Sequence, residues 1–287
     1  MQWNKAKNFM LVFFLLANIL LLALIRHETG NHTLSRERES AILNVLEQNN
    51  IIVYYHIPRQ FSPMRPLQVA AYEYDFNRLV DIFFPYYADE ISHAKDINLD
   101  IFSWENNYRL VISNGYISFT RERGAGGVPD TYASIALTQA FIREHYPDFR
   151  LDIHSTRQAR RGGLRIFYRQ EYQNTMIYTN FVEFLITGEG HDIIIEEVDI
   201  QYGRPIGFAY APRELVGPDE ALLTFVQNVR LQNDTDIIIS HMDIVYFQTM
   251  PGLIETYTPI YAEPFYRIFI EGQDEPFLIN AYTNRLH

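Results

Sequence analysis

An uninterrupted apolar stretch near the start of the chain, from Phe9 to Ile25, sets the strongest limit on its architecture. It contains no charged residue, and a helix needs roughly 17–25 apolar residues to cross a bilayer. The alternative is a cleavable signal peptide, which has an apolar region of about 7–15 residues followed by a small-residue cleavage site. Arg26-His27-Glu28 offers no such site. We therefore predict a transmembrane helix over 9–25, preceded by a cytoplasmic tail over 1–8.

The charges on either side of this stretch predict its orientation. Lys5 and Lys7 precede it without any acidic residue, whereas Arg26 is soon followed by Glu28. By the positive-inside rule, the N-terminus lies in the cytoplasm and everything after Arg26 lies outside the cell membrane. Of the 24 Lys and Arg residues, 22 remain once Lys5 and Lys7 are set aside, against 35 Asp and Glu, so the outer part has a net charge of −13 (22 minus 35).

A polar residue, Asn18, interrupts the apolar stretch in its middle. An amide in hydrocarbon is costly unless it is hydrogen-bonded, and a neighbouring transmembrane helix is one source of a partner. Its own helix or a water molecule is the other source. The predicted contact face has 4-3-4-3 spacing and consists of Leu11, Leu15, Asn18, Leu22 and Ile25.

The composition of the chain excludes several classes of protein. The net charge of −11 argues against a nucleic-acid partner, because phosphate neutralisation requires a basic surface. The chain has no cysteine, which excludes disulfide bonds, thiolate zinc sites and a cysteine nucleophile. Its 20 Tyr and 20 Phe favour β-sheet over a helical bundle.

The first part of the outer region predicts a juxtamembrane helix followed by a mixed subdomain. Within 26–50, apolar pairs four residues apart indicate a helix over 35–50. Residues 51–123 predict a subdomain of strands and one short helix near 76–84. The strands are expected at 51–56, 67–74, 108–113 and 116–121, and Asn114-Gly115 is a strong hairpin signal.

The remainder predicts two helix-plus-sheet units, over 124–212 and 213–287. Pro129-Asp130 opens a helix that runs to about residue 146, and Gly217-Pro218-Asp219 opens another. Strand-like runs follow each helix, so we expect an α+β fold of antiparallel sheets, each packed by a helix. The two units could be related by duplication, although a second internal similarity with a different offset does not fit a single event.

No catalytic or metal-binding constellation is recognisable. No H-E-x-x-H or G-x-S-x-G sequence is present. His241 and Asp243 share one face of a predicted strand, but two ligands fall short of the usual four. Glu197 and Asp199 likewise share a face without a second carboxyl across a cleft. We therefore expect no cofactor and no enzyme activity.

One basic cluster stands out from the acidic background. Two interpretations remain open: it could bind an anionic wall polymer, anionic headgroups or an acidic partner, or it could simply protect strand edges with solvated charges. Its members are Arg157, Arg160, Arg161, Arg165 and Arg169.

Two stretches at the ends of the chain form recognisable motifs. Met1-Gln-Trp-Asn-Lys-Ala-Lys7 runs into an apolar segment that contains Asn18, and the C-terminal region contains Pro264-Phe-Tyr-Arg267 and Phe277-Leu-Ile-Asn-Ala-Tyr-Thr283. These stretches resemble the YycI family of Gram-positive membrane proteins. Two positions depart from the family pattern, since Tyr266 replaces Trp and Asn284 replaces a turn Gly. Asn tolerates left-handed geometry, so the turn can form. The residues that carry the resemblance are Trp3, Lys5, Pro264, Tyr266, Arg267, Asn280 and Ala281.

The resemblance implies a single-pass membrane regulator. The family acts with a YycH-like protein on a WalK-type sensor histidine kinase that controls cell-wall metabolism, partly through transmembrane helices. Two alternatives are a wall-polymer binding module that uses the arginine cluster and a membrane-tethered hydrolase. The hydrolase would require Glu197, Asp199, His241 and Asp243 to converge in one pocket.

Overall fold

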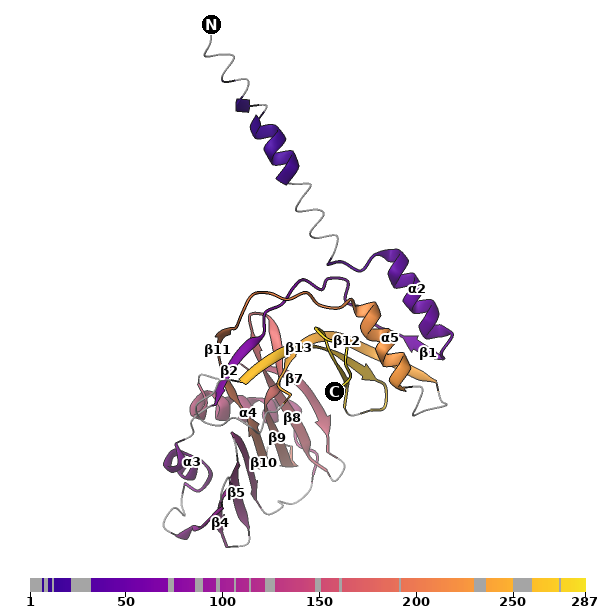
Figure 1. The fold of residues 1–287 in the computed structure, drawn as a ribbon. Helices are drawn as coiled ribbons and strands as arrows, with labels where there is room; N and C mark the ends of the chain where they lie inside the picture. Colours follow the sequence, from indigo (N-terminus) through magenta and orange to yellow (C-terminus); the bar gives the residue numbers. More distant parts are fainter. Residues whose placement is uncertain are drawn as a thin grey trace. The chain divides into compact units, whose positions relative to one another are not determined.

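A computed structural model describes residues 32–287, with gaps, together with residues 7, 10–11 and 13–21. The gaps are 72–74, 86–89, 97–98, 106, 114, 122–126, 148–150, 160–161, 191, 230–235, 250–259 and 274. The protein has an α+β fold with a large mixed sheet. The chain forms two compact units, which alternate along the sequence (Figure 1).

The N-terminal part of the described chain is helical at residues 10–11 and 13–21. No helix built from the described residues is both long enough and apolar enough to cross a membrane. Phe9, Val12 and residues 22–25 of the predicted span lie outside the described residues.

Unit 1 comprises residues 1–64, 211–243 and 265–287. Helices α2 (Arg36–Glu47) and α5 (Pro218–Val229) pack against each other, and Figure 1 shows them side by side. Strand β1 (Ile51–Val53) pairs in parallel with the start of β12 (Ile237–Phe247). Strand β14 (Phe277–Asn280) pairs antiparallel with the end of β13 (Ile260–Ile270).

Local sequence explains both helices of unit 1. The Ser35 side chain caps α2 by accepting a hydrogen bond from the Arg38 backbone N–H, and this satisfies a donor that the helix itself cannot. On α2, Ile42 and Leu46 are buried. On α5, the four apolar positions that the sequence places three to four residues apart are all buried, which confirms the predicted helix; they are Leu222, Phe225, Val226 and Val229.

Unit 2 comprises residues 65–210 and 244–264. Its strands β3 to β10 form an antiparallel sheet in the order β7-β8-β9-β10-β6-β5-β4-β3. Strands β2 and β11 pair with each other, and β2 also pairs with the start of β13. The bounds are β2 (Leu67–Ala71), β3 (Ser92–Asp96), β4 (Leu99–Trp104), β5 (Tyr108–Ser113), β6 (Tyr116–Arg121), β7 (Leu151–Gln158), β8 (Leu164–Tyr172), β9 (Thr175–Glu189), β10 (Asp192–Gln201) and β11 (Gly203–Phe208).

Two helices, α3 (Phe76–Phe83) and α4 (Thr131–His145), cover one face of this antiparallel sheet. Helix α4 starts where the sequence predicts, because the Asp130 carboxylate caps it by accepting from the Ala133 N–H at 2.7 Å. Alternate residues of β8 point into the core between sheet and helices. The opposite face of β8 therefore carries the polar residues of the arginine cluster.

The predicted hairpin is confirmed, whereas the prediction of antiparallel sheets holds only in part. Strands β5 and β6 pair from Ser113 and Tyr116 across a two-residue turn that contains Gly115 at φ 82°. Strand β12, however, runs parallel to β1 and to β9, so the sheet is mixed. Both parallel pairings join segments far apart in the sequence, and hairpin signals report only neighbours.

Candidate functional site

The predicted transmembrane contact face lies on the N-terminal helix. Leu11, Leu15 and Asn18 are helical and exposed, and the side chains of Leu11 and Leu15 are 60% and 62% exposed. The Asn18 Nδ2 donates a hydrogen bond to the Phe14 carbonyl at 2.8 Å. One N–H of the amide is thus satisfied within its own helix, which was one of the two alternatives. Leu22 and Ile25 lie outside the described residues.

The arginine cluster lies on the face of unit 2's sheet that the helices leave uncovered. Arg157 on β7 is directly opposite Arg165 on β8, and cross-strand partners share a face. We call this surface the arginine face. It continues through Glu183 on β9 to Asp199 on β10 and Tyr116 on β6. Arg160 and Arg161 lie outside the described residues.

Two carboxylates hold the central arginine of this face. Arg165 Nη1 donates to Glu183 Oε1 at 2.5 Å, and its Nη2 donates to Glu197 Oε2 at 2.9 Å. The side chains are only partly exposed, at 27% for Arg165 and 15% for Glu183. Burial raises the pKa of the Glu183 carboxyl, and the Arg165 charge opposes that shift. Both terminal nitrogens of the Arg165 guanidinium are therefore hydrogen-bonded to neighbouring strands of the sheet.

The same face places two carboxylates directly opposite each other. Asp199 is the register partner of Glu183, a like-charge pair that costs stability by itself. The Tyr116 hydroxyl donates to Asp199 Oδ1 at 2.7 Å. Burial and the neighbouring Asp199 raise the pKa of Tyr116 to about 12. Tyr116 remains a neutral donor to Asp199 at ordinary pH.

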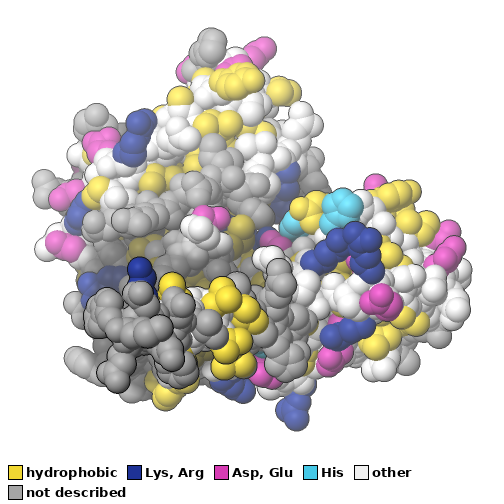
Figure 2. All heavy atoms as spheres, turned by 90° about the horizontal axis from the view of Figure 1, so that it is seen from above, with side chains coloured by type: hydrophobic (Ala, Val, Ile, Leu, Met, Phe, Trp, Pro, Cys, Tyr) yellow, Lys and Arg dark blue, Asp and Glu magenta, His cyan; other side chains and the backbone are white. Residues whose placement is uncertain are grey.

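The two remaining described arginines of the cluster pack on aromatic rings. The Arg157 guanidinium lies 5.0 Å from the centre of the Phe167 ring, and that of Arg169 lies 4.2 Å from the Tyr178 ring. Arg169 also donates to the Tyr178 carbonyl. Arg157 is exposed, whereas Arg169 is only partly exposed. With its carboxylates included, the described arginine face mixes both charge signs. Lys and Arg side chains also lie among Asp and Glu over the surface seen in Figure 2.

All the C-terminal motif residues except Pro264 occupy structural positions in unit 1. The Arg267 side chain is 1% exposed and donates to both oxygens of Asp243, from Nε at 2.9 Å and from Nη2 at 2.5 Å. Tyr266 is fully buried, and its hydroxyl donates to the Val216 carbonyl at 2.7 Å. Pro264 is buried in unit 2. Trp3 and Lys5 lie outside the described residues.

The last motif residues build a turn. The Asn280 Oδ1 accepts from the backbone N–H groups of Tyr282 and Thr283 at 2.9 and 3.0 Å, and Ala281 is buried. Asn284 has φ 55°, the left-handed conformation that was expected where the family has Gly. The turn therefore forms with Asn in place of Gly.

The candidate hydrolase residues are divided between the two units. His241 Nε2 lies 3.3 Å from Asp243 Oδ2 in unit 1, but both carboxylate oxygens of Asp243 already accept hydrogen bonds from Arg267. Glu197 and Asp199 belong to β10 of unit 2. In the part of the chain that the structure describes, no three His, Asp or Glu side chains are arranged to hold a metal ion.

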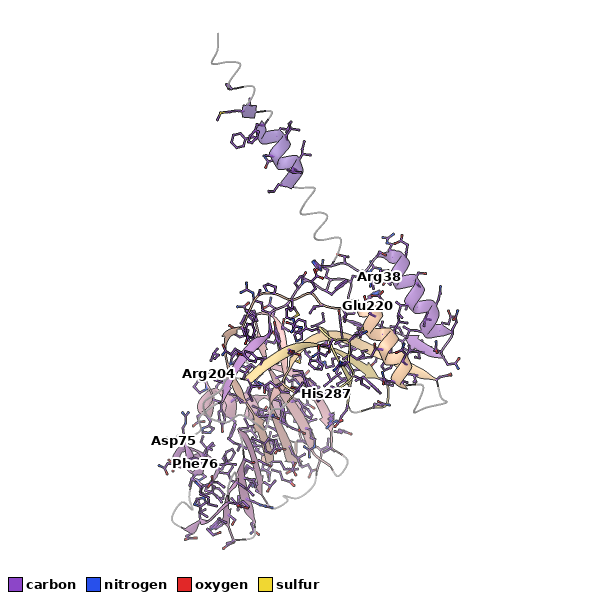
Figure 3. All side chains as sticks on the ribbon, viewed as in Figure 1. Arg38, Asp75, Phe76, Arg204, Glu220 and His287 are labelled. Atoms are coloured by element: carbon purple, nitrogen blue, oxygen red, sulfur yellow. The ribbon has the colours of Figure 1, made fainter. Side chains whose placement is uncertain are left out.

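Sequence reasoning missed an ion pair that ties α2 to α5. Arg38 donates to Asp219 Oδ2 at 2.8 Å and Oδ1 at 2.7 Å, and it reaches Glu220 Oε1 at 3.4 Å. Figure 3 labels Arg38 and Glu220 on these neighbouring helices. The residues are so far apart in the chain that no local pattern joins them. The exposed apolar residues at β1, Ile52 and Tyr54, were also missed, although two adjacent tyrosines after an apolar run could have been noticed.

Comparisons with known proteins give a likeness of fold only. No family model matches the chain, and no curated protein sequence matches it. The structure is similar to that of an uncharacterized protein from Eubacterium rectale ATCC 33656, with a TM-score of 0.46 and 12% identity, over 82% of this chain and 88% of the other. It is also similar to the Bacillus megaterium YpeB C-terminal domain, with a TM-score of 0.37 and 9% identity, over 76% and 98% of the two chains.

Proposed function

We propose that this chain is a membrane-anchored, extracytoplasmic accessory protein that regulates a WalK-type sensor histidine kinase together with a YycH-like protein. The observation that carries the membrane attachment is the N-terminal helix. Among the described residues of this helix, every large apolar side chain from Met10 to Leu21 is 55–64% exposed. A helix that is apolar on every side belongs inside a large core or a bilayer.

Further along unit 1, residues 32 and 34 are hydrogen-bonded to the segment at 59–61. The Leu34 N–H donates to the Arg59 carbonyl at 2.8 Å, and the Phe61 N–H donates to the His32 carbonyl at 3.1 Å. Residues 22–31 are all that separate the described helix from these hydrogen-bonded residues.

The regulatory role is supported by the resemblance at both ends of the chain and by the structural use of its C-terminal motif. Arg267 and Asn280 both make specific hydrogen bonds, so these motif residues stabilise the fold of the C-terminal region. An accessory protein shifts a kinase only if it binds one kinase state better than the other. A coupling of about 1–3 kcal/mol corresponds to an affinity ratio of roughly 5–150.

The test is to change the anchor without changing the outer units. One variant replaces 9–25 with an unrelated apolar helix, and another carries Asn18→Leu; Leu16→Ile, on the opposite side of the helix, is the control. We expect the replacement to remove regulation and Asn18→Leu to weaken it by about threefold, because intramembrane hydrogen bonds average about 0.6 kcal/mol. Kinase-dependent transcription at matched protein levels is the readout. Unchanged output in both variants would defeat the proposal.

A further inference from the structure

Edge strands expose unpaired backbone N–H and C=O groups, and proteins usually protect them. In unit 2, β11 carries Pro205 and a bulge beside it, so its ladder is interrupted. Strand β3 carries Lys95 and Asp96, and charged side chains discourage a further strand from pairing. Strand β7 has a bulge after Ile153. Each of these edges is protected against pairing.

In unit 1, the C-terminal tail covers the edge of β14. The Asn280 N–H donates to the Arg285 carbonyl at 2.9 Å, and the His287 N–H donates to the Leu278 carbonyl at 2.9 Å. The backbone groups at the outer edge of this strand are therefore satisfied within the chain.

Strand β1 lacks every one of these protections. Its residues Ile51-Ile52-Val53 and the following Tyr54-Tyr55 include no proline, glycine or charged side chain, and its register with β12 contains no bulge. Among the residues that the structure describes, β1 pairs with β12 alone. As far as the described residues go, its second edge is thus unpaired and available to another strand.

The hydrogen bonds to β12 show which backbone groups point to that second edge. The Ile237 N–H donates to the Asn50 carbonyl, and the Tyr54 N–H donates to the Ile239 carbonyl, at 3.0 and 3.1 Å. Backbone groups alternate in direction along a strand, so the even-numbered residues face β12. The N–H and C=O groups of Ile51 and Val53 consequently face outward.

The side chains of β1 suit an added strand as well. Ile51 is 2% exposed on the side of α2, whereas Ile52 and Tyr54 are 46% and 73% exposed on the other face. A strand laid along β1 would cover these two apolar side chains and gain cross-strand contacts with them. In Figure 1, β1 lies beside α2.

We propose that the open edge of β1 binds an extended segment of the regulated kinase's outer region, which joins the sheet of unit 1 as a further strand. This deepens the proposed function and rests on it for the identity of the partner. The segment would carry apolar side chains opposite Ile52 and Tyr54. Glu47, exposed at the end of α2, and Asp236, exposed just before β12, precede the paired starts of β1 and β12 and favour a Lys or Arg at that end of the segment.

A second copy of this chain is a poorer occupant. The outer part carries −13 (22 Lys and Arg minus 35 Asp and Glu), so two copies repel each other. A contact through so short a strand covers less than the roughly 800 Å² per partner that a stable complex buries. Any occupant therefore needs the high effective concentration of a shared membrane, and the charge is what disfavours a second copy.

The experiment uses the full chain in its native membrane. A photoreactive benzoylphenylalanine replaces Tyr54, and the control position is Tyr132 on α4, which is 84% exposed. We expect a crosslink to the tagged kinase from position 54 and none from 132. Ile52→Lys adds a protective charge to the edge and should lower the yield at least tenfold. Ile206→Lys is the matched control, because Ile206 is 47% exposed on the protected strand β11.

A second variant, Val53→Pro, removes an outward N–H but no hydrogen bond to β12, and it should also abolish the crosslink. Circular dichroism of Ile52→Lys establishes that the fold is retained. A Tyr54 product containing only two copies of this chain, or an equal kinase yield in the Ile52→Lys variant, would overturn the strand proposal. If the kinase crosslink is absent but anchor replacement still alters kinase output, only the strand proposal fails.

Discussion

Removing the carboxylate of Asp243 tests how unit 1 accommodates a buried guanidinium. Asp243→Asn keeps the shape of the side chain but removes its charge and directs an N–H group at Arg267. The Arg267 side chain is 1% exposed, and Asp243 is 29% exposed. Breaking a buried ion pair by removing one partner costs about 3–5 kcal/mol. Because water reaches Asp243 in part, we expect a loss near the lower end, about 3 kcal/mol.

A second substitution separates the ion pair from the general effect of mutating the site. Arg267→Met removes the cation while keeping a long apolar side chain. In the double variant the stranded charge is gone, so we expect it to be about 1–2 kcal/mol more stable than Asp243→Asn alone. That sign is opposite to the one expected for two independent destabilising substitutions.

Hydrogen exchange of the full chain, read by mass spectrometry over the unit 1 parts of β12 and β13 (237–243 and 265–270), measures this effect within unit 1. Peptides from β4 and β5 of unit 2 provide the internal control. The reasoning is refuted if Asp243→Asn changes the opening free energy by less than about 0.5 kcal/mol, or if the double variant is less stable than Asp243→Asn.

Two further predictions concern unit 2. Gly188→Ala should destabilise it by about 3 kcal/mol or more, because φ is +126° and the new Cβ would overlap the Asp192 carbonyl oxygen. Gly190→Ala, at φ +57° with open space around it, should cost only about 1–2 kcal/mol. Equal losses of the two variants in urea unfolding would contradict this. The raised Tyr116 pKa, about 12, means that folding favours the neutral phenol, so the stability it contributes is complete below pH 10 and declines toward pH 12. The advantage of the wild type over Tyr116→Phe in alkaline unfolding should shrink over that range, and a constant difference would disprove the assignment.

Local signals in the sequence were sufficient for most helices and for the hairpin. Asp130 predicted the start of α4 because a cap acts on N–H groups only two or three residues away. The buried stripe of α5 followed from the spacing of Leu222 and Phe225. Asn284 was expected to adopt the left-handed conformation, since that preference belongs to the residue itself.

The arginine cluster shows where sequence reasoning stops. Arg157 and Arg165 lie only eight residues apart in the chain, so the sequence itself indicates a basic patch. The carboxylates that bind Arg165 come from Glu183 and Glu197 on two other strands, and only the sheet register brings them there. Whether a charge is free or paired depends on such register.

The chain's local chemistry therefore decided the apolar N-terminal helix, the helix starts and the tight turn, because each depends on residues within a few positions of one another. The pairing of β1 with β12, the Arg38 contact with Asp219 and the open edge of β1 were decided by tertiary packing. These contacts join segments nearly two hundred residues apart, and their formation depends on the cooperative burial of the whole of unit 1. No short stretch of sequence holds that information.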